Sequence, residues 1–158
     1  MPIRKTGLIF LALSCASFSQ VPDFTPPTPL FGAVSRNDAT EVARLLAGGA
    51  NPNEGQMLGA SPLTVALMQR NPAAAMALMA KGADVKALDG AGSTTLMWAA
   101  ASETGDAGIV NELLRRGVDP NAVNKMGENA LQWAMRRGFT PATQALIRAQ
   151  PEPLSVPW

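Results

Sequence analysis

The apolar positions of this 158-residue chain recur with a long period. An alanine column, a column of apolar pairs and a glycine column each repeat at separations of 33 or 35 residues. The columns are Ala33, Ala66, Ala99 and Ala134; Leu45-Leu46, Leu78-Met79, Leu113-Leu114 and Leu146-Ile147; and Gly49, Gly82 and Gly117. All three place two extra residues near Glu103 and Thr104. The pattern therefore predicts a repeated structural unit with one short insertion between two helices.

Within each unit, the residue order predicts two helices separated by turns. Ser61 followed by Pro62 has the residue types of an N-cap and a first helical position. Ile109-Val110 and Leu113-Leu114 have the i, i+1, i+4, i+5 spacing that gives a helix one apolar face. Glycines of the repeating column suit the left-handed residue that ends a helix. A second glycine column, at Gly59, Gly92 and Gly127, predicts the turn that opens each unit.

These units resemble ankyrin repeats. The motifs that carry the resemblance are Thr28-Pro29-Leu30, Ser61-Pro62-Leu63-Thr64-Val65-Ala66, Thr94-Thr95-Leu96-Met97-Trp98-Ala99-Ala100, Gly49-Ala50-Asn51-Pro52-Asn53, Gly82-Ala83-Asp84-Val85-Lys86-Ala87 and Gly117-Val118-Asp119-Pro120-Asn121-Ala122. The resemblance covers Thr28 to Ala149. It implies an all-α fold, an ankyrin-repeat solenoid of about four helix-turn-helix units joined by hairpin-like turns, with approximate boundaries 28–55, 56–88, 89–123 and 124–149.

The chain departs from the family pattern in the first helix, where a His is usual. Phe31, Thr64, Met97 and Gln132 stand at that position. We therefore expect packing and capping alone to hold the turns. The two ends of the array are expected to act as caps with polar faces. These faces are Arg36, Asn37, Asp38 and Glu41 at one end and Gln144, Arg148 and Gln150 at the other.

Residues 1–19 have the order of a signal peptide. Arg4 and Lys5 precede an apolar stretch, and small residues follow it before an expected cut after Ser19, with Ala16 as an alternative. Removal would take away Cys15, although a lipid anchor at Cys15 is the alternative. We expect residues 20–27 to be an extended lead-in and 150–158 a Pro-rich tail, either unattached or with Leu154, Val156 and Trp158 packed on the last helix pair.

Composition argues against most enzyme chemistry. The chain has no His, so Ser-His or Cys-His catalysis and His metal ligands are excluded. A hydrolase using Glu103 or Asp106 remains a remote alternative to solvated turn residues, and we expect no cofactor and no metal. Processing would leave 11 basic against 12 acidic residues, a net charge of −1, which gives no electrostatic case for nucleic acid.

The resemblance implies a non-enzymatic protein-protein interaction scaffold, expected to be monomeric, without a membrane span, and periplasmic or secreted. An accessory or protective module for an exported redox enzyme is the alternative function. The expected partner-binding residues lie at hairpin tips and on first helices, and their character changes from apolar to basic along the array. They are Met57, Leu58, Met68, Gln69, Ser93, Ser102, Lys125, Met126, Glu128, Arg136 and Arg137, flanked by Ala60, Ala91 and Ala101.

Two aromatic residues leave a further choice open. Trp98 and Trp133 occupy equivalent positions 35 residues apart, in the first helices of neighbouring units. We expect the two rings to stack against each other in the core, and a ligand-stacking pair is the alternative.

Overall fold

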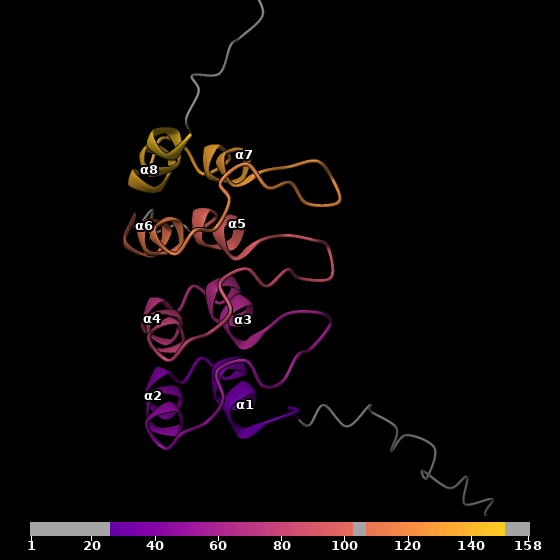
Figure 1. Cartoon of the computed structure of the whole chain (residues 1–158), viewed down its shortest axis with the longest axis vertical. Coiled ribbons are helices and arrows are strands. Elements are labelled where there is room, and N and C mark those ends of the chain that lie inside the picture. The colour runs from indigo at the N-terminus through magenta and orange to yellow at the C-terminus, as the bar shows by residue number, and fades with distance from the viewer. Residues whose placement is uncertain (1–25, 103–106, 151–158) are drawn as a thin grey trace, which may run out of the picture.

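The chain forms a stack of four helix pairs (Figure 1). The computed structural model describes residues 26–102 and 107–150, which contain eight α-helices. The first-helix layer consists of α1 (Pro29–Ser35), α3 (Pro62–Met68), α5 (Thr95–Ala100) and α7 (Ala130–Met135); the second-helix layer consists of α2 (Ala39–Ala47), α4 (Pro72–Ala80), α6 (Ala107–Arg115) and α8 (Pro141–Ala149). The predicted all-α solenoid of helix pairs is confirmed.

Several sequence-based expectations fall outside the described residues. These are the signal peptide at 1–19, the carboxylates of Glu103 and Asp106, and the packing of Leu154, Val156 and Trp158. Among the helices that the structure describes, none combines the length and the apolar character needed to span a bilayer.

The helix boundaries follow from capping residues that the sequence displays. The Ser61 hydroxyl accepts a hydrogen bond from the Thr64 amide at 3.2 Å, and Pro62 begins α3. At the other ends, the glycine column has positive φ, at +90°, +86° and +81° for Gly49, Gly82 and Gly117. Both predictions are confirmed, because side chains that satisfy orphan amides begin these helices and left-handed glycines follow their ends.

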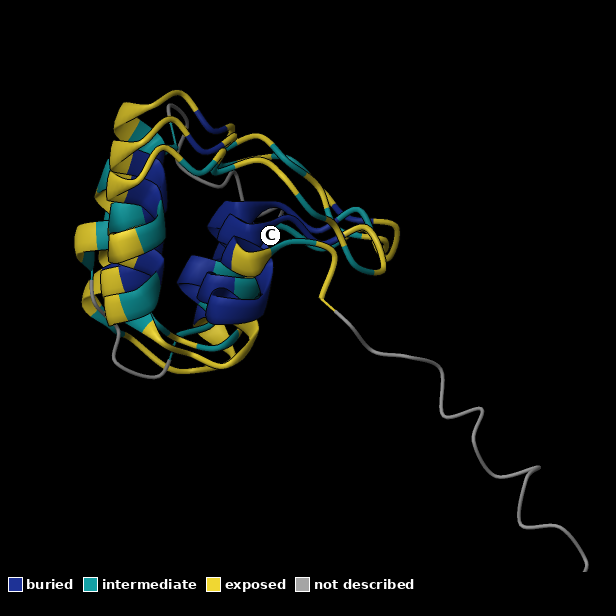
Figure 2. Cartoon of the chain, turned by 90° about the horizontal axis from the view of Figure 1, so that it is seen from below, coloured by how far each residue is buried: buried dark blue, intermediate teal, exposed yellow. Residues whose placement is uncertain are grey.

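Between the two helix layers lies one continuous core (Figure 2). The alanine column is 0 to 4% exposed, and so small a side chain lets neighbouring helices approach closely. Helices α3 and α5 each pack on the second helix of the same unit and on the first helices of both neighbouring units. Burial of their apolar side chains therefore depends on stacking. The buried leucines of the first helices are Leu30, Leu63, Leu67, Leu96 and Leu131.

Hydrogen bonds between units hold the turns, which corrects the expectation of packing and capping alone. Gln69 Nε2 donates to the Ser35 carbonyl at 2.9 Å, and Asn71 Nδ2 donates to Asn37 Oδ1 at 2.6 Å. Other donors lie on hairpins and just after a second helix. They are Asn53 Nδ2 to the Gly82 carbonyl at 3.1 Å, Arg116 Nη1 to the Met79 carbonyl at 2.8 Å, and Lys125 Nζ to the Gly90 carbonyl at 2.7 Å.

The residues that replace the family's His act within their own units. Thr64 shares a 3.0 Å hydrogen bond with Ser61, and Gln132 Oε1 accepts from the Asn129 amide at 2.8 Å. The Met97 sulfur makes a capping contact of the same kind, because it accepts a hydrogen bond from the backbone N–H of Thr94. Phe31 is buried at 1% exposure. The roles of the usual His are therefore divided between local capping and contacts made by other side chains.

The hairpin-like turns project from the first-helix layer and stack backbone to backbone. A Cβ atom placed on Gly59 would lie 2.8 Å from the Gly90 amide nitrogen. A Cβ atom on Gly90 would lie 2.8 Å from the Leu58 carbonyl oxygen. Both distances are far inside van der Waals contact, so glycine is required at each position for the second and third units to stack.

The C-terminal end of the stack exposes apolar side chains that the expected polar face did not include, although Gln144 and Arg148 of that face are exposed as well. Met135, Phe139 and Ile147 are 62%, 75% and 47% exposed. Met135 is equivalent to Leu67, which is 4% exposed because the third unit covers it. At the opposite end, the exposed residues Arg36, Asn37 and Asp38 are polar, as predicted.

Replacing Gly90 by Ala tests the close approach of the hairpins. We expect Gly90→Ala to lower the free energy of unfolding by about 1–3 kcal/mol, because the new methyl group would clash with the Leu58 carbonyl oxygen, and that backbone atom can shift only together with its hairpin. Gly48→Ala is the matched control, since its Cβ would lie 3.4 Å from the nearest atom it meets, the Leu45 carbonyl oxygen. Urea unfolding measures both, and equal effects would contradict a tight contact at Gly90.

A second pair of variants tests the open C-terminal end. Leu67→Ala should cost about 2–5 kcal/mol, because it leaves a cavity between units. Met135→Ala at the equivalent end position should change stability by less than about 1 kcal/mol. Thermal unfolding gives both values, and a large loss for Met135→Ala would show that other atoms cover this end.

Candidate protein-binding surface

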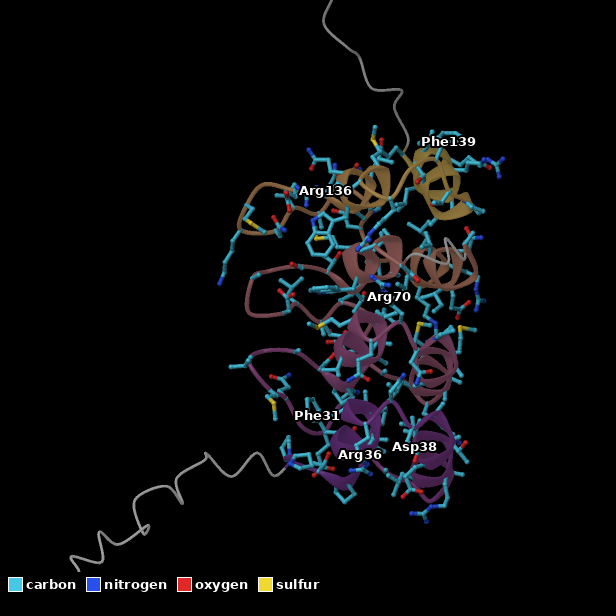
Figure 3. All side chains as sticks on the ribbon, turned by 180° about the vertical axis from the view of Figure 1, so that it is seen from behind. Phe31, Arg36, Asp38, Arg70, Arg136 and Phe139 are labelled. Carbon is cyan, nitrogen blue, oxygen red and sulfur yellow. The ribbon has the colours of Figure 1, made fainter. Side chains whose placement is uncertain are left out.

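Two cavities open on the first-helix layer, the first between this layer and the hairpins and the second beside α5 and α7. We call the first the apolar groove, which has a volume of about 480 Å³, and the second the Trp-Arg pocket, which has a volume of about 410 Å³. Phe31 at one end of the stack and Arg136 near the other both lie on the hairpin side of this layer (Figure 3). Lining the apolar groove are Phe31, Ser35, Met57, Leu58, Ala60, Val65, Met68, Gln69, Asp89, Gly90 and Ala91; lining the Trp-Arg pocket are Trp98, Ala101, Trp133, Arg136 and Arg137.

Several polar groups of the apolar groove are occupied by the fold itself, although Gln69 Oε1 is buried without a hydrogen-bond partner. Asp89 Oδ1 accepts from the amides of Ala91 and Ser93, both at 2.8 Å. Asp89 Oδ2 accepts from Trp98 Nε1 at 2.9 Å, and Gln69 donates its amide group to Ser35. The surface that remains for a partner is mainly methionine, leucine, valine and alanine.

Leu58 occupies an unusual backbone conformation at the hairpin tip. Its φ is +54° and that of Gly59 is +80°, and Met57 pairs with Ala60 across this two-residue turn. Such a turn favours Asn-Gly, because a leucine in the left-handed region costs about 1 kcal/mol. Leu58 is also 89% exposed. Both the backbone strain and the exposure of Leu58 are unfavourable for folding. This combination indicates a functional role for Leu58.

The Trp-Arg pocket is built around an aromatic pair. The rings of Trp98 and Trp133 meet edge to face, with centroids 5.0 Å apart and an interplanar angle of 85°. The predicted contact between them is confirmed, but both residues are half-buried at the cavity rather than enclosed in the core. Their ring surfaces therefore contribute to the pocket.

Glu128 organises the basic side of this pocket. One of its oxygens, Oε2, accepts from Trp133 Nε1 at 2.9 Å, while Oε1 pairs with Arg136. The hydrogen bond from Trp133 is the largest of the causes that lower the pKa of Glu128, and Arg136 and Asn124 add to it. Glu128 therefore stays ionised, which fixes the orientations of Trp133 and Arg136 together.

Most of the predicted partner-binding residues lie at or beside the two cavities. Met57, Leu58, Ala60, Met68, Gln69 and Ala91 line the apolar groove, while Ala101, Arg136 and Arg137 line the Trp-Arg pocket. Glu128 adjoins the pocket through Trp133. Lys125 and Met126 are exposed on the next hairpin.

Two predicted residues are placed elsewhere. The backbone N–H of Ser93 donates to Asp89 within the hairpin, and the residue is 1% exposed. Its side chain is therefore not accessible to a partner. Ser102 is half-buried and lines a separate small crevice with Leu67, Ile109 and others. Ser93 is therefore excluded from the binding surface, while Ser102 lies apart from the two cavities.

The basic residues of the third and fourth units lie on two different sides of the stack. Arg115 and Arg116 lie on or just after α6 in the second-helix layer, where both pair with Glu112 at 2.6 Å. Hydrogen bonds from Arg115 and then Arg116 lower the pKa of Glu112. Lys125, Arg136 and Arg137 lie on the hairpin side instead. The basic residues that line the two cavities, Arg136 and Arg137, therefore both belong to the fourth unit.

Sequence reasoning missed several lining residues, namely Phe31, Ser35, Val65, Asp89 and Gly90, and gave Trp98 and Trp133 mainly a core role. The repeat carried a usable signal, because Val65, Trp98 and Trp133 are equivalent positions, as are Met68, Ala101 and Arg136. Side chains of one such column line successive cavities on one face.

Glu103 and Asp106, the carboxylates considered for acid–base chemistry, lie outside the described residues, whereas the nearby Asp119 is described. Asp119 uses Oδ1 to accept from the Asn121 amide at 2.8 Å, which is the role of a turn residue. Within 26–102 and 107–150, no group of three or more His, Cys, Asp or Glu side chains is arranged to hold a metal ion.

Comparison with known proteins connects this architecture with a family. Residues 30–105 and 96–153 match the family description "Ankyrin repeats (3 copies)". Human "Ankyrin repeat domain-containing protein 63" is 34% identical over 125 residues, which cover 75% of this chain and 33% of that protein. The zebrafish "Putative palmitoyltransferase ZDHHC13" is 32% identical over 77% of this chain and 19% of its own length. The Arabidopsis thaliana "E3 ubiquitin-protein ligase KEG" is 34% identical over 73% of this chain and 7% of its own length.

This chain thus spans a third or less of each of these relatives, so their enzyme names describe proteins of which it matches a small part. Ankyrin repeats are a protein-protein interaction module and are typically non-enzymatic. The family matches, the 33-residue period and the stacked helix pairs agree, and the chain belongs to the ankyrin-repeat family.

Proposed function

We propose that this protein is a non-enzymatic scaffold that binds another protein through the apolar groove and the Trp-Arg pocket, in an exported compartment. The observation that carries the binding surface is Leu58. This residue combines a strained backbone with near-complete exposure beside a largely apolar groove. A hairpin selected for stability alone would favour Asn at this position.

The exported location rests on the order of residues 1–19, with Arg4 and Lys5 before an apolar stretch and small residues after it. We expect residues 1–27 to export alkaline phosphatase when fused in place of that enzyme's own leader. Leu11→Arg should abolish export, and with it the phosphatase activity outside the cytoplasm, because a charge interrupts the apolar stretch. Equal phosphatase activity from the two fusions would contradict the proposal.

Position-specific cross-linking tests the binding surface in the cell. A photo-crosslinking amino acid at position 58 should give one or a few discrete adducts with a partner protein. The matched control is position 43, because Ala43 is exposed on α2 in the second-helix layer. No adduct at position 58, or the same adducts from both positions, would overturn the proposed surface.

Leu58→Asn separates binding from stability. We expect the variant to be more stable by about 1 kcal/mol, because Asn tolerates the left-handed conformation that Leu does not. Capture of the cross-linked partner should fall at the same time, since an apolar contact is lost. Thermal unfolding and capture measure the two effects. If stability and capture both fell, Leu58 would have a structural role instead.

A further inference from the structure

The fourth unit ends the stack with an uncovered apolar face. Met135 of α7 is 62% exposed, although the equivalent residues of the other units are 1 to 4% exposed because the following unit covers them. Those residues are Val34, Leu67 and Ala100. Ile147 of α8 and Phe139, at the same end of the stack, are 47% and 75% exposed. We call Met135, Phe139 and Ile147 the terminal face.

Phe139 stands where two other units place a helix cap. Its equivalents are Asp38 and Asn71, whose side chains accept hydrogen bonds at the starts of α2 and α4. In the fourth unit Thr140 caps α8 instead, so the cap has moved by one residue. Phe139 lies at the C-terminal end of the stack (Figure 3). A large apolar side chain in this exposed position does not stabilise the repeats, which indicates a contact outside them.

Charge also distinguishes this end of the stack. The fourth unit, 124–149, contains four basic residues and one acidic residue, which gives a net charge of +3. The first unit, 28–55, contains two basic and three acidic residues, which gives a net charge of −1. The acidic residue of the fourth unit, Glu128, pairs with Arg136 on the hairpin side, whereas Arg148 is exposed on α8. The terminal face therefore belongs to a unit of net positive charge.

A second copy of this chain does not match the terminal face. Two terminal faces brought together would place two units of positive charge against each other. Against the opposite end of the stack, the apolar side chains would meet the exposed polar residues Arg36, Asn37 and Asp38. An anionic bilayer matches both properties, because its acyl region takes up apolar side chains while its phosphates attract basic ones.

We propose that the terminal face docks on the surface of an anionic membrane, with Phe139 in the acyl boundary and Arg148 at the level of the phosphates. The hairpins project from the side of the stack rather than from its end (Figure 1). Attachment by the end therefore leaves the apolar groove and the Trp-Arg pocket open to a partner. The two surfaces are separate, so membrane docking does not rest on the proposed binding of a protein.

An environment-sensitive fluorophore at position 139 tests the docking in the full chain. Phe139→Cys in a Cys15→Ser background gives a single thiol for a nitrobenzoxadiazole label. Vesicles of equal parts phosphatidylglycerol and phosphatidylcholine should shift its emission to the blue, because the label enters the acyl boundary. Met135→Cys provides a second reporter on the same face. The matched control is Ala80→Cys, since Ala80 is exposed on α4 in the middle of the stack, and its label should not respond.

Lipid titration of the label at position 139 separates the contribution of charge. Arg148→Gln should raise the half-maximal lipid concentration about fivefold, which corresponds to about 1 kcal/mol for one basic residue near an anionic surface. Lys81→Gln removes the same charge from an exposed position in the middle of the stack and should leave the concentration unchanged. Salt at about 1 M should weaken docking, because the Debye length falls to about 3 Å.

Each outcome decides for or against the terminal face. A blue shift at positions 139 and 135 that requires phosphatidylglycerol supports docking. Unchanged emission at both positions overturns it, and so does an equal shift with pure phosphatidylcholine or at position 80. Emission at position 139 that is already blue-shifted without vesicles would show that another segment or a second copy covers the face, which also overturns it. Cross-linking from position 58 is unaffected by any of these results, so the proposed function is tested separately.

Discussion

The structure depends on the close stacking of units that cannot bury their own apolar faces. The alanine column, at 0 to 4% exposure, marks where first helices approach one another, and the leucines beside it fill the space between layers. Stability in such an array is the sum of unit terms and interface terms. Stacking also shapes the proposed binding surface, because it brings equivalent side chains from successive units onto one face.

Variation between the repeats gives the proposed binding surface two parts of different chemistry. One column reads Val65, Trp98, Trp133 and a second reads Met68, Ala101, Arg136, so a single backbone geometry presents aliphatic chemistry in the second unit and aromatic, basic chemistry in the fourth. Asp89 and Glu128 play equivalent roles, since each accepts a hydrogen bond from the tryptophan indole of its own unit. Polar groups near the cavities thus mainly orient the rings and hairpins.

The fold could be predicted in detail because its determinants are local or periodic. Ser61 and Pro62 mark a helix start, Gly49, Gly82 and Gly117 mark helix ends, and the 33-residue period identifies the stacked unit. What could not be predicted depends on contacts between units. The bond from Gln69 to the Ser35 carbonyl and the approach of Gly59 to Gly90 join residues more than 30 positions apart, with no residue type that marks the pairing. Ser93 and Leu58 show the same limit for the site, because a hydroxyl was expected outside and is buried, and a leucine adopts a conformation that leucines avoid.

Amide hydrogen exchange of the full chain, with and without the partner identified by cross-linking, tests most directly whether stacking creates one binding face. We predict slower exchange on binding at the hairpins around 57–60, 89–92 and 125–128 and at the C-terminal ends of α3 and α7. Exchange in the exposed turns of α2, α4, α6 and α8 should not change. Protection confined to the second-helix layer would contradict a binding face on the hairpin side.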